Sequence, residues 1–185
     1  MMSITLRWVL IFLGVALLVL GALYVIVPAL YGVPSVSTRT ERIRKALRLA
    51  GLQPGETLFD LGCGNGRVLV IAAREFGARA MGIEIGPAQC LVSWVNARLN
   101  GVGSRVRVRR ADFYRADLRA ADVVFVYLTS AQTARLQARL EEQLRPGARV
   151  VTVSADFRGW KPSAFDNADL LFLYRMPPEG STPVP

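Results

Sequence analysis

The residues best suited to chemistry lie in one short segment, residues 60–67, with the sequence DLGCGNGR. Its glycines, Gly62, Gly64 and Gly66, would let the backbone turn sharply and approach a ligand closely. A helix that begins just after them would offer free N–H groups to a carboxylate or a phosphate. Dinucleotide enzymes place their Gly-x-Gly-x-x-Gly loop at the same point, so glycines alone do not define the ligand.

The loop departs from the dinucleotide pattern in two ways. Arg67 stands where that pattern has its third glycine, and an acid, Asp60, precedes the loop. A carboxylate at this position suits the ammonium group of a methionine moiety, whereas it would repel a pyrophosphate. The sequence therefore favours S-adenosylmethionine over NAD as the cofactor. Arg67 opposes the dipole of the expected helix, and could pair with Asp60, bind the methionine carboxylate or lie on the surface.

Two further acids follow at regular intervals along the chain. Glu84 comes 22 residues after Gly62, close to the spacing of about 20 at which an acid binds ribose hydroxyls. Asp112 is followed by Phe113, and this pair could accept a hydrogen bond from the adenine amino group and cover its ring. Each acid follows an expected strand, and the carboxyl ends of parallel strands meet in one crevice. The three acids are therefore expected to converge.

The elements that must position these residues alternate in type. The pattern predicts strands at Thr57–Leu61, Arg79–Ile85, Arg105–Arg109, Ala121–Leu128, Ala148–Ser154 and Asp169–Arg175. It predicts helices at 36–50, Arg67–Phe76, Pro87–Leu99 and Ala131–Leu144. Such alternation indicates an α/β fold: a Rossmann-like, mostly parallel sheet with helices on both faces. Residues 155–168 are too few for a crossover helix and a strand, so we expect a shortened sheet of six strands.

The N-terminus carries an apolar segment of a different kind. From Trp8 to Tyr31 there are 24 residues without a charge. A helix of that length rises about 36 Å, enough to cross a hydrocarbon core of roughly 30 Å. A cleaved signal peptide is the alternative, but its apolar region is shorter and 33–35 is a poor cleavage site. The sequence thus predicts a transmembrane anchor (1–34), a basic juxtamembrane helix (35–52), one catalytic domain (53–176) and a disordered tail (177–185).

Charge predicts the orientation of this anchor. Only Arg7 precedes the apolar segment, whereas five basic residues follow it within residues 39–48. Basic residues favour the cytoplasmic side, so the domain is expected there, with the basic cluster near anionic headgroups. The net charge of +9 could also suggest nucleic acid, but the cations outside the cluster are scattered. We expect a basic, membrane-proximal protein and no nucleic-acid partner.

The composition excludes several catalytic classes. The chain has no histidine, which removes Ser-His-Asp and Cys-His catalysis and most transition-metal chemistry. Its two cysteines, Cys63 and Cys90, lack the spacing of a metal site or a disulfide framework. No metal is therefore expected.

The motifs DLGCGNGR, GIEIGP, ADF and LRPGARVV resemble those of class I, seven-strand S-adenosylmethionine-dependent methyltransferases. The order of YGVPS, AREFGARAMGIEI, DFYRADL and ADVVFVYLT is similar to small protein-lysine methyltransferases. These include archaeal broad-specificity enzymes and the membrane-anchored mitochondrial enzyme acting on the c-ring protein of ATP synthase. The resemblance adds Cys63 and Ile85 to the cofactor site and implies lysine methylation of a protein at the membrane. Asn65 and Gly86 depart from the family, which often has aspartate at both positions.

The resemblance also suggests where the acceptor binds. In the family the fourth strand ends at the transfer site, which reads Val-Tyr-Leu-Thr here and contains Tyr127. It is not the Asn/Asp-Pro-Pro-Tyr of amino-methylating DNA enzymes. Tyr127 could bind a lysine amine or simply be a core tyrosine. Tyr31 and Pro34 match a segment that lines the substrate cleft, or they are an interface tyrosine and a linker proline.

Three functions stay open at this stage. The first is methylation of a protein lysine, whose amine must first lose a proton to Asp112, Tyr127 or water. The second is methylation of a small molecule or lipid, and the third is a non-catalytic module that binds S-adenosylmethionine. The intact glycine loop and three acids argue against the third.

Overall fold

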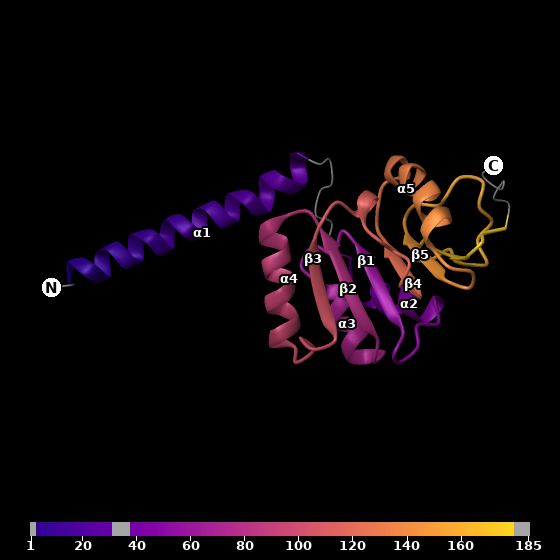
Figure 1. Ribbon diagram of the computed structural model, residues 1–185, viewed down its shortest axis with the longest axis horizontal. Helices are drawn as coiled ribbons and strands as arrows, with labels where there is room; N and C mark the ends of the chain where they lie inside the picture. Colours follow the sequence, from indigo (N-terminus) through magenta and orange to yellow (C-terminus); the bar gives the residue numbers. More distant parts are fainter. Residues whose placement is uncertain (1–2, 31–37, 180–185) are drawn as a thin grey trace.

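The computed structural model describes residues 3–30 and 38–179, as one long helix and an α/β domain (Figure 1). In chain order the elements are α1 (Ile4–Leu30), α2 (Thr40–Leu49), β1 (Thr57–Leu61), α3 (Arg67–Glu75), β2 (Arg79–Glu84), α4 (Pro87–Leu99), β3 (Val106–Arg110), the 3₁₀ turn η1 (Phe113–Arg115), β4 (Val123–Val126), α5 (Ser130–Gln143), β5 (Arg149–Val153), β6 (Ala164–Asp166) and β7 (Leu171–Arg175). Every predicted strand and helix of the domain is present, with ends that differ by a few residues.

The sheet confirms the predicted fold class. Its strand order is β3-β2-β1-β4-β5-β7-β6. The first five strands are parallel, and β7 runs antiparallel to both β5 and β6. The crossover helices between parallel strands cover the two faces of the sheet, as expected for this topology.

The prediction of six strands is wrong, because the sheet has seven. The extra strand, β6, has only three residues and lies inside the segment expected to hold none. A parallel neighbour would need a crossover helix, but β6 pairs antiparallel with β7, and an antiparallel pair needs only a short turn. The segment is therefore long enough for a strand of this kind.

Two hydrophobic clusters sandwich the sheet, one on each face. The central strand β4 divides its side chains between them: Val123 and Phe125 belong to one cluster, and Val124 and Val126 to the other. The first cluster contains the buried faces of α2 and α3, and the second contains Leu136 and Leu140 of α5. Since β4 is buried on both faces, its apolar run is typical of a parallel strand.

The basic segment before the domain forms α2, which packs on the sheet. Arg42 donates hydrogen bonds to the Asp169 carbonyl (2.8 Å) and to Ser154 Oγ (2.9 Å). Two ion pairs add to these bonds: Arg44 pairs with Glu75 (2.8 Å), and Lys45 pairs with Asp169. Three of the five cations expected near headgroups are thus bound to the domain. These contacts help to hold α2 on the domain.

Helix α1 extends away from the domain (Figure 1). The stretch Ile4–Tyr24 has a mean hydropathy of 2.4, and none of its most apolar window is buried. Its length and composition are those of a membrane span, although a signal sequence would have the same features. Near its end, the Tyr24 carbonyl accepts a hydrogen bond from Gln89 Nε2 of α4 (2.6 Å). At the other end of the chain, Glu179, which falls in the tail expected to be disordered, pairs with Lys161.

Candidate functional site

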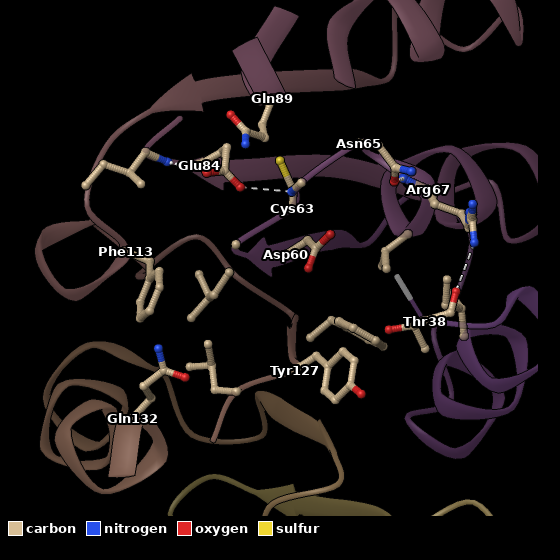
Figure 2. A pocket seen from close by; sticks show the side chains of 18 of the residues that line it. Thr38, Asp60, Cys63, Asn65, Arg67, Glu84, Gln89, Phe113, Tyr127 and Gln132 are labelled. Atoms are coloured by element: carbon tan, nitrogen blue, oxygen red, sulfur yellow. Dashed lines mark hydrogen bonds between the residues drawn. The ribbon is translucent and has the colours of Figure 1, made fainter. Parts of the chain in front are cut away.

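A cavity of about 490 Å³ lies at the carboxyl ends of the central strands (Figure 2). Eight residues that the sequence predicted for the site line it: Asp60, Gly62, Cys63, Gly64, Glu84, Ile85, Phe113 and Tyr127. They come from the ends of β1, β2 and β4 and from η1, and so are drawn from residues 60–127 of the sequence. The parallel order of these strands brings their ends together, as expected for this class of sheet.

Asp60 is the most deeply buried acid of the cavity. Its side chain is only 3% exposed, and no cation among the described residues pairs with it. Burial, and secondarily the charge of Glu84, raises the pKa of Asp60 to about 8. A buried carboxylate without a partner is costly, and a ligand cation would remove that cost. Figure 2 shows this carboxylate between the glycine loop and Tyr127.

Glu84 is held by the backbone around it. Its Oε1 accepts hydrogen bonds from the N–H groups of Ile85 and Gly86 (2.9 Å each), and its Oε2 accepts one from Gly64 (2.9 Å). A carboxylate oxygen can accept two bonds, so Oε2 can accept one more, and Glu84 lines the cavity. Glu84 therefore fixes the glycine loop as well as offering an oxygen to a ligand.

The first two glycines of the loop border open space. Gly62 has φ +87° and Gly64 φ +51°, and a Cβ built on either would meet nothing within 4 Å. The left-handed backbone explains why glycine is needed, and the open space allows a ligand to approach the main chain. Cys63 between them is buried, which raises the pKa of its thiol, so it is not activated as a nucleophile.

Two predicted cofactor residues do not line the cavity. Gly66 (φ +75°) packs against α4 instead, where an added Cβ would lie 2.2 Å from Ser93 Oγ. Asp112 caps η1, accepting a hydrogen bond from the Tyr114 N–H (2.9 Å). Gly66 thus serves close packing, and Asp112 orients the turn that carries Phe113 into the cavity. Tyr31 and Pro34 lie outside the described residues.

Tyr127 occupies the side of the cavity opposite the glycine loop. Its ring is half-buried, and the Arg42 guanidinium lies 5.9 Å from the ring centroid. Thr38 lines the same side, and its carbonyl accepts a hydrogen bond from Arg67 Nη1 (3.1 Å). Arg67 therefore does not pair with Asp60, but joins the glycine loop to the chain before α2.

Sequence reasoning missed several polar or aromatic residues of the lining, among them Tyr24, Gln89, Gln132 and Ser154. Ser154 has φ +70° directly after β5, and such strain is frequent at functional sites. Gln89 is 1% exposed, and its Oε1 has no partner among the described residues. The sequence did show a glutamine near the start of α4, which could have suggested a polar residue in the site. Whether its side chain points into the cavity, however, depends on tertiary packing.

Comparison with known proteins agrees with this geometry. Residues 60–164 match the model of the "ANTKMT methyltransferase domain". A protein-lysine N-methyltransferase of Saccharolobus islandicus is 34% identical over 70% of this chain and 81% of its own. An adenine nucleotide translocase lysine N-methyltransferase of Mus musculus is 31% identical over 84% of this chain and 69% of its own.

A solved structure has the same fold along most of the domain. It is an RNA methyltransferase of Salinibacter ruber in complex with S-adenosylhomocysteine, 34% identical, with a TM-score of 0.77 over 80% of this chain and 98% of its own. These comparisons confirm the prediction that the chain is an S-adenosylmethionine-dependent methyltransferase. They also confirm its resemblance to lysine methyltransferases. The chain belongs to the family of the ANTKMT methyltransferase domain.

Proposed function

We propose that this methyltransferase modifies a lysine side chain of a protein at or in a membrane. The observation that carries the proposal is the composition of the cavity wall. One side holds Asp60 and the glycine loop, and another holds Tyr24 of the long apolar helix α1. An acceptor in this cavity would therefore lie beside the helix that can span a membrane. The lysine methyltransferases among the relatives support the choice of acceptor.

The cofactor residues fit S-adenosylmethionine, which supplies an electrophilic methyl group when bound. Asp60 would hold its ammonium group, and the open space at Gly62 and Gly64 would admit the methionine moiety against the backbone. The free acceptor position of Glu84 would bind a ribose hydroxyl. Ile85 and Phe113 offer apolar surfaces to the adenine ring. Asp112 acts indirectly, by holding Phe113.

The acceptor side favours a neutral amine. It combines Tyr127 with apolar residues such as Ile43 and Leu128. Such surroundings disfavour a charged ammonium and so lower the pKa of an entering lysine. Because Asp112 does not line the cavity, Tyr127 and water remain as candidates to receive the proton. The main contribution of the protein is then to orient the amine and to exclude bulk water.

Replacing Tyr127 with Phe should lower kcat while leaving cofactor affinity nearly unchanged. Tyr127 lines the cavity, and if its hydroxyl binds the acceptor as proposed, loss of one hydrogen bond in the transition state costs about tenfold in rate. Tyr114→Phe is the matched control, because Tyr114 does not line the cavity and its hydroxyl contacts the Gln132 carbonyl (3.5 Å). Single-turnover kinetics and calorimetry would test this. Equal turnover of Tyr127→Phe and native protein would remove Tyr127 from the acceptor site.

Methyl-labelled S-adenosylmethionine should label a protein band when the enzyme is added to membranes of a strain lacking it. Protein, lipid and RNA fractions are counted separately, because the apolar cavity could also admit a lipid and one structural relative is an RNA enzyme. Acid hydrolysis should then release methyl-lysine. Label confined to lipid or RNA would contradict the proposed acceptor but not the methyltransferase activity.

We place α1 across the membrane once, with the domain on the cytoplasmic side. The asymmetry of the flanking cations supports this orientation: Arg7 alone before the helix, and five basic residues in 39–48 after it. Protease added to sealed spheroplasts should leave the domain intact, and should digest it once the membrane is opened. Digestion in sealed spheroplasts would reverse the orientation.

A further inference from the structure

Helix α4 has the reverse of the usual polarity for a surface helix. Its inward face is small and polar, with Gln89, Ser93 and Ala97 buried. Its outward face is apolar and exposed, with Leu91 45%, Val92 37%, Trp94 47%, Val95 37% and Leu99 82% exposed. Surface helices normally place such residues toward the core, and contiguous exposed apolar patches mark interaction sites. We call these five residues the α4 outer face.

The α4 outer face lies at the edge of the domain from which α1 departs. Figure 1 shows α4 at the left edge of the domain and α1 running away from its upper end on that same side. The hydrogen bond from Gln89 to the Tyr24 carbonyl fixes this junction. If α1 spans a bilayer, the surface of that bilayer must come next to α4.

The charges around α4 suit an anionic surface. Residues 85–111, which contain α4 and β3, include five arginines and no acid. On α4 itself, the Arg98 guanidinium lies 4.2 Å from the centroid of the Trp94 ring. Tryptophan and long basic side chains are the residues that favour the interface between headgroups and acyl chains.

We propose that the α4 outer face lies in the interface of an anionic lipid membrane and seats the catalytic domain against it. This inference builds on the proposed anchor, which keeps the lipid surface permanently beside α4. Interfacial helices bind in this way, with the apolar face below the headgroups and basic residues among them. Since Gln89 of α4 and Tyr24 of α1 both line the cavity, this contact also fixes the distance between the cavity and the membrane.

Tryptophan quenching in the full chain, reconstituted into phosphatidylcholine–phosphatidylglycerol vesicles, tests the contact. The emission of Trp94 is obtained by subtracting the spectrum of Trp94→Phe from that of the native protein. We expect this emission to be blue-shifted, quenched by lipids brominated near the headgroup, and protected from iodide. The double variant Leu91→Gln/Leu99→Gln should lose the quenching. Leu170→Gln, at a site 45% exposed next to β7, is the matched control and should keep it.

Two outcomes would overturn the inference. Trp94 emission that iodide quenches and brominated lipid does not would mean that α4 faces water. Protection from both quenchers would mean that a protein, such as a second copy of the chain, covers α4. The same subtraction with Trp8→Phe reports on α1. Lipid quenching of Trp8 without quenching of Trp94 would leave the anchor standing and remove the α4 contact, whereas the reverse would remove the anchor alone.

Discussion

Asp60→Asn should weaken binding of S-adenosylmethionine by about tenfold to a hundredfold, as expected for losing a charged hydrogen bond worth roughly 1.5–3 kcal/mol. The same change should stabilise the ligand-free protein near neutral pH, because it removes a buried carboxylate that has no cation partner among the described residues. Calorimetric titration and thermal unfolding measure the two effects. Unchanged affinity would show that Asp60 does not contact the cofactor.

The pH dependence of this stabilisation has a definite sign. The folded pKa of Asp60, about 8, lies above its ordinary value of 3.8. The folded state therefore binds more protons, and its stability is greatest below the unfolded pKa and falls as the pH rises through about 8. As the pH rises from 3.8 to about 8, the free energy of unfolding of the native protein should fall relative to that of Asp60→Asn.

Cofactor binding should also release protons. At about pH 6.5 most Asp60 is protonated and the α-amino group of the cofactor is charged, so pairing the two ionises the acid. Calorimetry in buffers of different ionisation enthalpy should detect the release of nearly one proton with native protein. Asp60→Asn should release none. Equal release by both proteins would assign the proton to another group.

Gly66→Ala should destabilise the domain by about 2–5 kcal/mol. Roughly 1–2 kcal/mol comes from placing a side chain in left-handed backbone, and about 1–3 kcal/mol from overpacking. The conformation has φ +75°, and the new Cβ would lie 2.2 Å from Ser93 Oγ and 3.1 Å from Ser93 Cα. Denaturant unfolding measures the free energy of unfolding. Cofactor affinity should fall only to the extent that the substitution displaces the glycine loop.

Gly101→Ala is the matched control for this packing. Gly101 has φ +72°, but a Cβ there meets nothing within 4 Å. It should therefore carry the backbone cost alone, about 1–2 kcal/mol. Equal destabilisation by the two variants would show that the contact between Gly66 and α4 adds nothing.

Asp60 is a cleaner probe of the cofactor site than Glu84. Glu84 accepts hydrogen bonds from three backbone N–H groups, including that of Gly64. Its replacement would release the glycine loop at the same time as it removed an oxygen from the cavity. Because unpaired buried N–H groups cost free energy of their own, the two effects could not be separated.

The sequence alone determined the order of the strands and helices of the domain apart from β6, the position of the glycine loop and the convergence of Asp60 and Glu84. These features depend on local periodicity, on turn residues and on one rule of topology, that parallel strands end on the same edge. The apolar character of β4 likewise follows from burial on both faces. Each of these signals is contained in a few consecutive residues.

Only the tertiary structure decided which side chains face the cavity. Gly66 and Asp112 have motif positions of cofactor residues, but one packs against Ser93 and the other caps η1. The cations of α2 bind the domain because Glu75 and Asp169, distant in sequence, lie opposite them. Tertiary packing also decides which face of α4 is exposed. The sequence of α4 predicts an apolar helix, but the helix packs on the domain through Gln89, Ser93 and Ala97, and its apolar side is left exposed. Such outcomes depend on contacts between segments far apart in the chain, which local sequence patterns do not contain.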